Sequence, residues 1–102
     1  MAKLGFSPEA LQDIKEHFQY HGDYSEKAER RFADKLDEVI GHLEQFPEFG
    51  RARPEIAPSI RGFPIKALRV AVFYTFDKEQ DTVLVARVLR QERDIDAVFT
   101  DD

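Results

Sequence analysis

Two runs of β-forming residues lie close together in the C-terminal part of the chain, at residues 68–76 and 82–90. Both are rich in Val, Leu, Phe or Tyr, and a polar stretch at residues 77–81 joins them. Such runs bounded by polar residues are typical of strands. Because both runs are apolar on both faces, we predict that they pair with each other, centrally and antiparallel.

Two amphipathic helices are predicted before these strands. Ser7-Pro8-Glu9 favours a helix start, because Ser caps free N–H groups, Pro suits the first helical position and Glu favours the positive helix end. We predict that His21-Gly22-Asp23 breaks this helix and that a second one starts near Ser25 and ends at Pro47. A short connection makes them an antiparallel hairpin. The second helix carries a continuous apolar stripe: Ala28, Phe32, Leu36, Val39, Leu43 and Phe46.

The other segments complete one domain over residues 1–102. Residues 3–6 form a first strand, residues 47–59 a loop with three prolines, and residues 60–65 a short strand. Pro64 marks that strand as an edge or a strand end. Residues 95–99 are expected to add a helical turn. The order is β-α-α-β-β-β, which predicts an α+β fold whose helical hairpin covers one face of a small, mainly antiparallel sheet.

Charge is distributed unevenly along the chain, whose net charge is -5. Residues 1–49 contain 6 basic and 11 acidic residues, whereas residues 51–93 contain 9 basic and 5 acidic ones. General nucleic-acid binders are usually basic overall, so this balance argues against that class. One positive patch could still face RNA, DNA or an acidic protein segment.

Composition excludes several other classes of protein. The chain has no cysteine, so disulfides and cysteine metal sites are excluded. No apolar run approaches the roughly 20 residues of a membrane helix, and the N-terminus lacks a secretory signal. A cytoplasmic location is therefore expected. His17 and His21 have a spacing that can chelate a metal, but two ligands do not make a site. We predict surface histidines, no metal and no cofactor.

Basic residues gather in the loop and sheet region, and Arg69 and Arg87 interrupt otherwise apolar strands. An arginine is expensive to bury unless it is paired. These arginines therefore either face a partner or form an internal ion pair, for example with Glu92 or Asp94. A cluster on one sheet face would suit phosphate or carboxylate groups. The set is Arg51, Arg53, Arg61, Lys66, Arg69, Arg87, Arg90 and Arg93.

Four aromatic residues of the predicted hairpin allow two interpretations. They can belong to the core, or they can offer a groove to a partner helix. Two tyrosines flank the hairpin turn, which favours some exposure there. The four are Phe18, Tyr20, Tyr24 and Phe32.

Several short segments, in the same order, resemble the ParE/RelE superfamily of toxins, and the ParE branch most closely. The resemblance covers nearly the whole chain. Its segments are Phe6-Ser7-Pro8-Glu9-Ala10, Gly50-Arg51, Ile60-Arg61-Gly62-Phe63-Pro64, Val72-Phe73-Tyr74, Arg87-Val88-Leu89 and Arg93-Asp94. One departure is Arg90-Gln91, where many ParE members have His-Gly.

The resemblance implies a toxin of a bacterial type II toxin–antitoxin system that inhibits growth by binding DNA gyrase and needs no cofactor. A ParD-like antitoxin would neutralise it by placing a helix against the helical hairpin and extending the sheet. The implied antitoxin-binding residues are the four aromatics named above. The implied target-binding residues are Arg61, Arg69, Arg87 and Arg93.

Two alternatives remain within the superfamily. A RelE-like, ribosome-dependent mRNA endonuclease would use Arg61 and Arg69 to stabilise phosphate charge. Such enzymes also need a proton-transfer group, and the residues after Arg93 (Asp-Ile-Asp-Ala-Val-Phe) include no Tyr or His. The other alternative is an inactive homologue that only binds an antitoxin.

Overall fold

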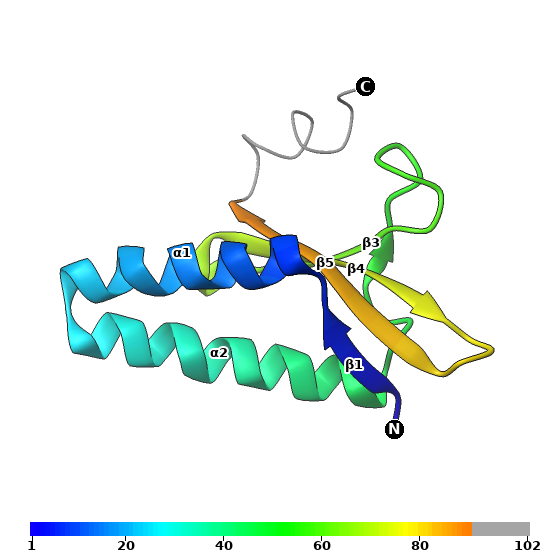
Figure 1. Ribbon diagram of the computed structural model, residues 1–102, viewed down its shortest axis with the longest axis horizontal. Coiled ribbons are helices and arrows are strands. Elements are labelled where there is room, and N and C mark those ends of the chain that lie inside the picture. Colours follow the sequence, from blue (N-terminus) through cyan, green and yellow to red (C-terminus); the bar gives the residue numbers. More distant parts are fainter. Residues whose placement is uncertain (91–102) are drawn as a thin grey trace.

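The protein consists of a helical hairpin packed on one face of a five-stranded sheet (Figure 1). The structure, a computed structural model, describes residues 1–90 of the 102. Predictions for Arg93 and for residues 95–99 lie outside this part. The elements are β1 (Lys3–Phe6), α1 (Pro8–Tyr24), α2 (Glu26–Gln45), β2 (Arg51–Ala52), β3 (Arg61–Ile65), the 3-10 turn η1 (Lys66–Leu68), β4 (Val70–Asp77) and β5 (Thr82–Arg90).

The sheet has the strand order β1-β5-β4-β3-β2. β1 runs parallel to β5, and every other neighbouring pair is antiparallel. The predicted central pair is confirmed, because β4 and β5 pair from Val70↔Arg90 to Asp77↔Thr82. The predicted α+β class is confirmed as well. The sequence missed β2, which lies inside the predicted loop and pairs only Arg51 and Ala52 with β3, since two residues carry no detectable period.

The prediction that His21-Gly22-Asp23 breaks the first helix was wrong. α1 continues through these residues to Tyr24, and the chain reverses at Ser25, whose backbone is extended. The Ser25 N–H donates to the His21 carbonyl at 3.1 Å, and its Oγ accepts from the Ala28 N–H at 3.0 Å. Ser25 thus ends α1 and caps α2. Because capping by Ser25 is sufficient to reverse the chain, α1 continues through Gly22 instead of ending there.

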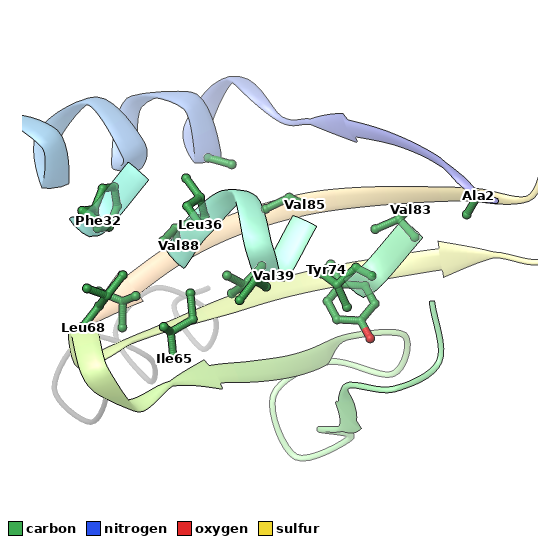
Figure 2. Close-up of a cluster of buried hydrophobic side chains, with 14 residues drawn as sticks. Ala2, Phe32, Leu36, Val39, Ile65, Leu68, Tyr74, Val83, Val85 and Val88 are labelled. Carbon is green, nitrogen blue, oxygen red and sulfur yellow. The ribbon is translucent and has the colours of Figure 1, made fainter. Parts of the chain in front are cut away.

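The main core lies between the helical hairpin and the sheet (Figure 2). The predicted stripe on α2 is confirmed in its middle, where Phe32, Leu36, Val39 and Leu43 are buried. A smaller cluster covers the opposite face of the sheet, so both faces of β4 are packed, as its apolar sequence requires. The second cluster contains Ile60, Ala71, Phe73 and Leu89.

A glycine and a tyrosine join the segment after α2 to the core. The Tyr74 ring of β4 is fully buried, and its hydroxyl accepts a hydrogen bond from the Gly50 N–H at 2.7 Å. Burial is the main cause that raises the pKa of Tyr74, although the Gly50 bond opposes it. A Cβ at position 50 would lie 2.6 Å from Cε1 of that ring. Gly50 is therefore required here by close approach.

Candidate functional site

The arginines that the sequence singled out do not form one cluster. Arg61, in β3, donates from Nη1 to the carbonyl oxygens of Glu48 at 2.9 Å and Gly50 at 2.7 Å. Arg69 lies beyond the other end of that strand, where Ile65 pairs with Val70. A rise of about 3.3 Å per residue separates the two ends of β3 by about 13 Å. Arg61 therefore holds the segment after α2, far from Arg69.

Arg87 forms an internal ion pair with Asp13 of α1. Its Nε donates to Oδ2 of Asp13 at 2.7 Å and its Nη2 donates to Oδ1 at 2.9 Å. Asp13 is 7% exposed, and its Oδ2 also accepts from the Val88 N–H at 3.0 Å. The hydrogen bond to Asp13 is the main cause that raises the pKa of Arg87. Of the two sequence interpretations, the internal pair holds for Arg87, with Asp13 of α1 as its partner. The suggested partners Glu92 and Asp94 lie outside the described residues.

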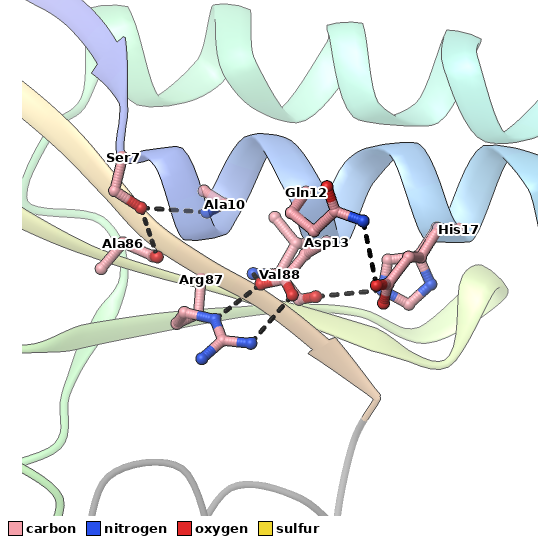
Figure 3. A network of polar contacts seen from close by, with 9 residues as sticks. Ser7, Ala10, Gln12, Asp13, His17, Ala86, Arg87 and Val88 are labelled. Atoms are coloured by element: carbon pink, nitrogen blue, oxygen red, sulfur yellow. Dashed lines mark hydrogen bonds and ion pairs between the residues drawn. The ribbon is translucent and has the colours of Figure 1, made fainter.

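Side chains of α1 continue the hydrogen bonding of β5 where β1 ends (Figure 3). A bulge leaves Ala86 without a partner in β4, and its carbonyl accepts from the Ser7 hydroxyl at 2.7 Å. Asp13 then accepts from the Val88 N–H, and His17 Nε2 lies 3.0 Å from the Val88 carbonyl oxygen. These contacts fix α1 along the edge of β5, which is the structural role of Asp13 and His17.

A cavity of about 770 Å³ lies between the helical hairpin and the ends of the sheet strands. Six of its lining side chains carry or can carry positive charge, and none of the described lining residues is acidic. We call this the basic cavity and define it by these six residues. They come from both helices, from the segment between β3 and β4, and from the end of β5: His17, His21, Arg31, Lys66, Arg69 and Arg90.

Arg69 has an unusual backbone at the basic cavity. Its φ of 57° and ψ of 36° are left-handed, and it ends η1. This conformation costs a residue with a bulky side chain on the order of 1–3 kcal/mol. Contacts elsewhere in the fold must offset that cost to keep Arg69 in it. Within residues 1–90, the structure shows no ion pair for Arg69, Arg31 or Lys66. All three are exposed, so their charges are available to a ligand.

The sequence identified this site only in part. Arg69 was selected as a target-binding residue, and Lys66 and Arg90 were noted among the basic residues. The predicted surface histidines are half-buried and line the cavity with Arg31. A signal existed, because position 17 lies seven residues after the fully buried Ala10 and therefore on the inward face of α1.

The rings of His17 and His21 are packed against Phe32, and the charge state of His21 depends on the cavity. His21 stacks on Phe32 with ring centroids 5.1 Å apart. Burial is the largest cause that lowers the pKa of His21, followed by the positive charges of His17, Arg31 and Arg90. The neutral form of His21 is thus favoured in the folded protein. Among residues 1–90, no group of three or more His, Cys, Asp or Glu could hold a metal.

This lowered pKa predicts how stability changes with pH. The unfolded chain binds a proton at His21 near the ordinary pKa of about 6.5, whereas the folded chain binds it only at lower pH. The contribution of neutral His21 to the folding stability is therefore fully present above the unfolded-state pKa of about 6.5. It is lost as the pH falls through the lower pKa of His21 in the folded protein. Urea unfolding at pH 7.5 and 5.0 should show a larger loss for the native chain than for His21→Phe, which keeps the stacking. Equal losses would contradict this.

Three of the four predicted antitoxin-binding aromatics, namely Phe18, Tyr20 and Phe32, differ in exposure. Phe32 is fully buried in the main core, so the core interpretation holds for it and it offers no surface to a partner. Phe18 is partly buried and packs edge-on against Phe32 at 5.1 Å between ring centroids. Tyr20 is 44% exposed, and its ring lies 4.9 Å from the Arg90 guanidinium carbon. Tyr24 is the last residue of α1.

The fold is that of the ParE and RelE toxins. A ParE–ParD system from P. aeruginosa superposes with a TM-score of 0.74 at 19% identity, over 90% of this chain and 98% of that one. The intact E. coli RelBE complex gives a TM-score of 0.64 at 15% identity, over 91% and 100%. A metal-bound toxin from Helicobacter pylori gives 0.55 at 18% identity, over 89% and 96%.

Residues 4–95 match the family described as the ParE toxin of the type II toxin–antitoxin system, parDE. The chain belongs to this family, and it is a toxin of the ParE/RelE superfamily. Among curated proteins, none matches the chain in sequence. In the part of the chain that the structure describes, neither helix has the length and apolar character that crossing a membrane requires.

Proposed function

We propose that this toxin inhibits growth by binding DNA gyrase and that a ParD-like antitoxin neutralises it. Support comes from the ParE family match over residues 4–95 and from a fold shared with a ParDE system at a TM-score of 0.74. The mechanism would be protein–protein binding, in which exposed guanidinium groups meet acidic groups of the target.

The separation of Arg61 from Arg69 carries the choice of gyrase binding over RNA cleavage. A ribonuclease of this kind needs cationic groups that converge on one phosphate. Here Arg61 is held by the carbonyls of Glu48 and Gly50, about 13 Å along β3 from the end nearest Arg69. The Arg61 guanidinium would have to leave these two carbonyls to join Arg69 at one phosphate. The lack of Tyr or His at positions 94–99 of the sequence points the same way.

The antitoxin would contact the outer side of the helical hairpin. Leu11 of α1 is 55% exposed, and Tyr20, about two and a half turns further along the helix and beside the basic cavity, is 44% exposed. Each side of α1 therefore offers a partner helix one exposed apolar contact. The edge of β3 beyond β2 suits an added strand poorly, because Pro64, which pairs with Ala71, offers no N–H of its own. We therefore expect side-chain contacts on α1 to contribute more to antitoxin affinity than added strand hydrogen bonds.

Induced expression without the antitoxin tests the proposal. We expect growth arrest with filamentous cells and, with purified protein, loss of gyrase supercoiling or accumulation of cleaved DNA, while a translation extract keeps its activity. Cleavage of mRNA in that extract would instead establish the ribonuclease alternative. Normal growth and active gyrase would leave only an antitoxin-binding homologue and would refute the proposal.

Among the proposed target-binding residues, Arg69 is exposed and has no ion pair within residues 1–90. We expect Arg69→Ala to raise the concentration needed for gyrase inhibition roughly tenfold, since a hydrogen bond to a charged group contributes about 1.5–3 kcal/mol. Arg51→Ala is the matched control, because Arg51 is also exposed but lies in β2 at the far edge of the sheet. Equal effects of both variants would refute a specific role for Arg69.

A further inference from the structure

We infer that the basic cavity binds a compact ligand with clustered phosphate groups, of the oligophosphate or nucleotide class. The inference concerns a small ligand and does not depend on gyrase, although it shares Arg69 with the proposed target surface. The first observation is the charge of the residues that line the cavity. The chain carries a net charge of -5, yet Arg31, Lys66, Arg69 and Arg90 line one cavity whose described lining includes no carboxylate.

The four permanent cations of the basic cavity reach it from separate elements. Arg31 comes from α2, Lys66 from η1, Arg69 from the left-handed position that ends η1, and Arg90 from the end of β5. Residues so far apart in the sequence line one cavity only in the folded chain. Like charges that converge in a hollow repel one another, and an anionic ligand would remove that repulsion.

The dimensions of the basic cavity fit a small molecule better than a single ion. Its volume of about 770 Å³ lies within the roughly 300–1,000 Å³ that is usual for small-molecule sites. One inorganic phosphate would leave most of this space to water. An oligophosphate chain could contact several of the cations at once.

Phosphate chemistry fits this site better than an acidic peptide. Arginine binds phosphate oxygens in a bidentate manner, and three arginines line the cavity. Neighbouring phosphates place several charges within a few ångströms. An extended peptide directs successive side chains to opposite faces, so a run of acidic residues cannot bring all its charges into one hollow.

His21 of the basic cavity adds a proton-linked contribution. Burial and the charges of His17, Arg31 and Arg90 lower the pKa of His21, and these are the groups that face it from α1, α2 and β5. A bound polyanion would reverse the effect of those charges and favour imidazolium. Binding should therefore favour proton uptake at His21.

The test is calorimetric titration of the full chain with sodium tripolyphosphate at low salt and pH 7. We expect binding that weakens roughly tenfold in Arg31→Ala, because each charge-assisted hydrogen bond contributes about 1.5–3 kcal/mol. Arg30→Ala is the matched control and should change affinity less than about twofold. Arg30 is the adjacent, exposed residue of α2 and does not line the cavity. Circular dichroism confirms that both variants are folded.

Further ligands distinguish the source of the phosphates. ATP binding at least as tightly as tripolyphosphate would support a nucleotide, and tighter tripolyphosphate binding would support an inorganic oligophosphate. The inference is overturned if tripolyphosphate does not bind, or if Arg30→Ala weakens binding as much as Arg31→Ala. It is also overturned if hexaglutamate or a single-stranded oligonucleotide binds more tightly than tripolyphosphate, because a peptide or a nucleic acid would then be the better occupant.

Discussion

Replacement of Asp13 by alanine should destabilise the folded protein by about 3 kcal/mol, since removing one partner of a buried ion pair typically costs 3–5 kcal/mol. Asp13 is 7% exposed and accepts two hydrogen bonds from Arg87 and one from the Val88 N–H. The variant would leave a guanidinium without its counter-ion and an N–H without its acceptor. We place the cost at the lower end because the Arg87 side chain is 26% exposed. Urea denaturation of the purified variant measures the change.

Glu16→Ala is the matched control for Asp13→Ala. Glu16 lies on the same helix but is exposed, and within residues 1–90 it accepts a hydrogen bond from Gln12 alone, at 3.1 Å. Its removal should change stability by less than about 0.5 kcal/mol. A double-mutant cycle with Arg87→Met then isolates the coupling between Asp13 and Arg87. A loss below 1 kcal/mol for Asp13→Ala would show that the pair does not fix α1 on β5.

Gly50→Ala should destabilise the protein by about 2–3 kcal/mol, in the range seen for overpacked cores. The new Cβ would lie 2.6 Å from Cε1 and 2.9 Å from Cζ of Tyr74. That ring is fully buried, so it cannot move away without disturbing its neighbours. The hydrogen bond from Gly50 to the Tyr74 hydroxyl would also be strained. Thermal unfolding should show a clearly lower midpoint.

Gly41→Ala provides a control of the same chemical change with the opposite sign. Gly41 lies inside α2, and a Cβ there would meet nothing within 4 Å. Alanine should therefore stabilise the helix by about 0.5–1 kcal/mol. If both substitutions changed the folding stability in the same direction, close contact with Tyr74 would not be the reason that position 50 requires glycine.

The features of the fold that the sequence predicted are those set by local pattern. The apolar runs at 68–76 and 82–90 correspond to β4 and β5, and the stripe from Phe32 to Leu43 faces the core. The N-cap at Ser7 is also confirmed, since its Oγ accepts from the Ala10 N–H. The errors lie where local rules compete. The sequence predicted that α1 would end around Gly22, whereas capping at Ser25 determines where the chain reverses.

The site was less predictable because tertiary contacts assemble it. The sequence suggested acidic residues close to Arg87 in the chain as its partners, whereas Asp13 is 74 positions away. One clue was present, since Asp13 lies three residues after the buried Ala10 and therefore on the inward face of α1. A carboxylate on that face requires a cationic partner. Nothing local indicates that Arg31 and Arg90 line the same cavity.

The parallel pairing of the first and last described strands has a consequence for synthesis on the ribosome. β1 and α1 leave the exit tunnel early, yet their strand and side-chain partners lie at residues 82–90. Translation must reach this distant segment before those contacts can form, and such non-local pairing is slow to establish. A nascent chain that stops earlier would lack them, so premature termination should yield no assembled toxin. Translation through β5 is thus required before the toxin can assemble, and the proposed antitoxin would have that interval in which to meet the emerging helices.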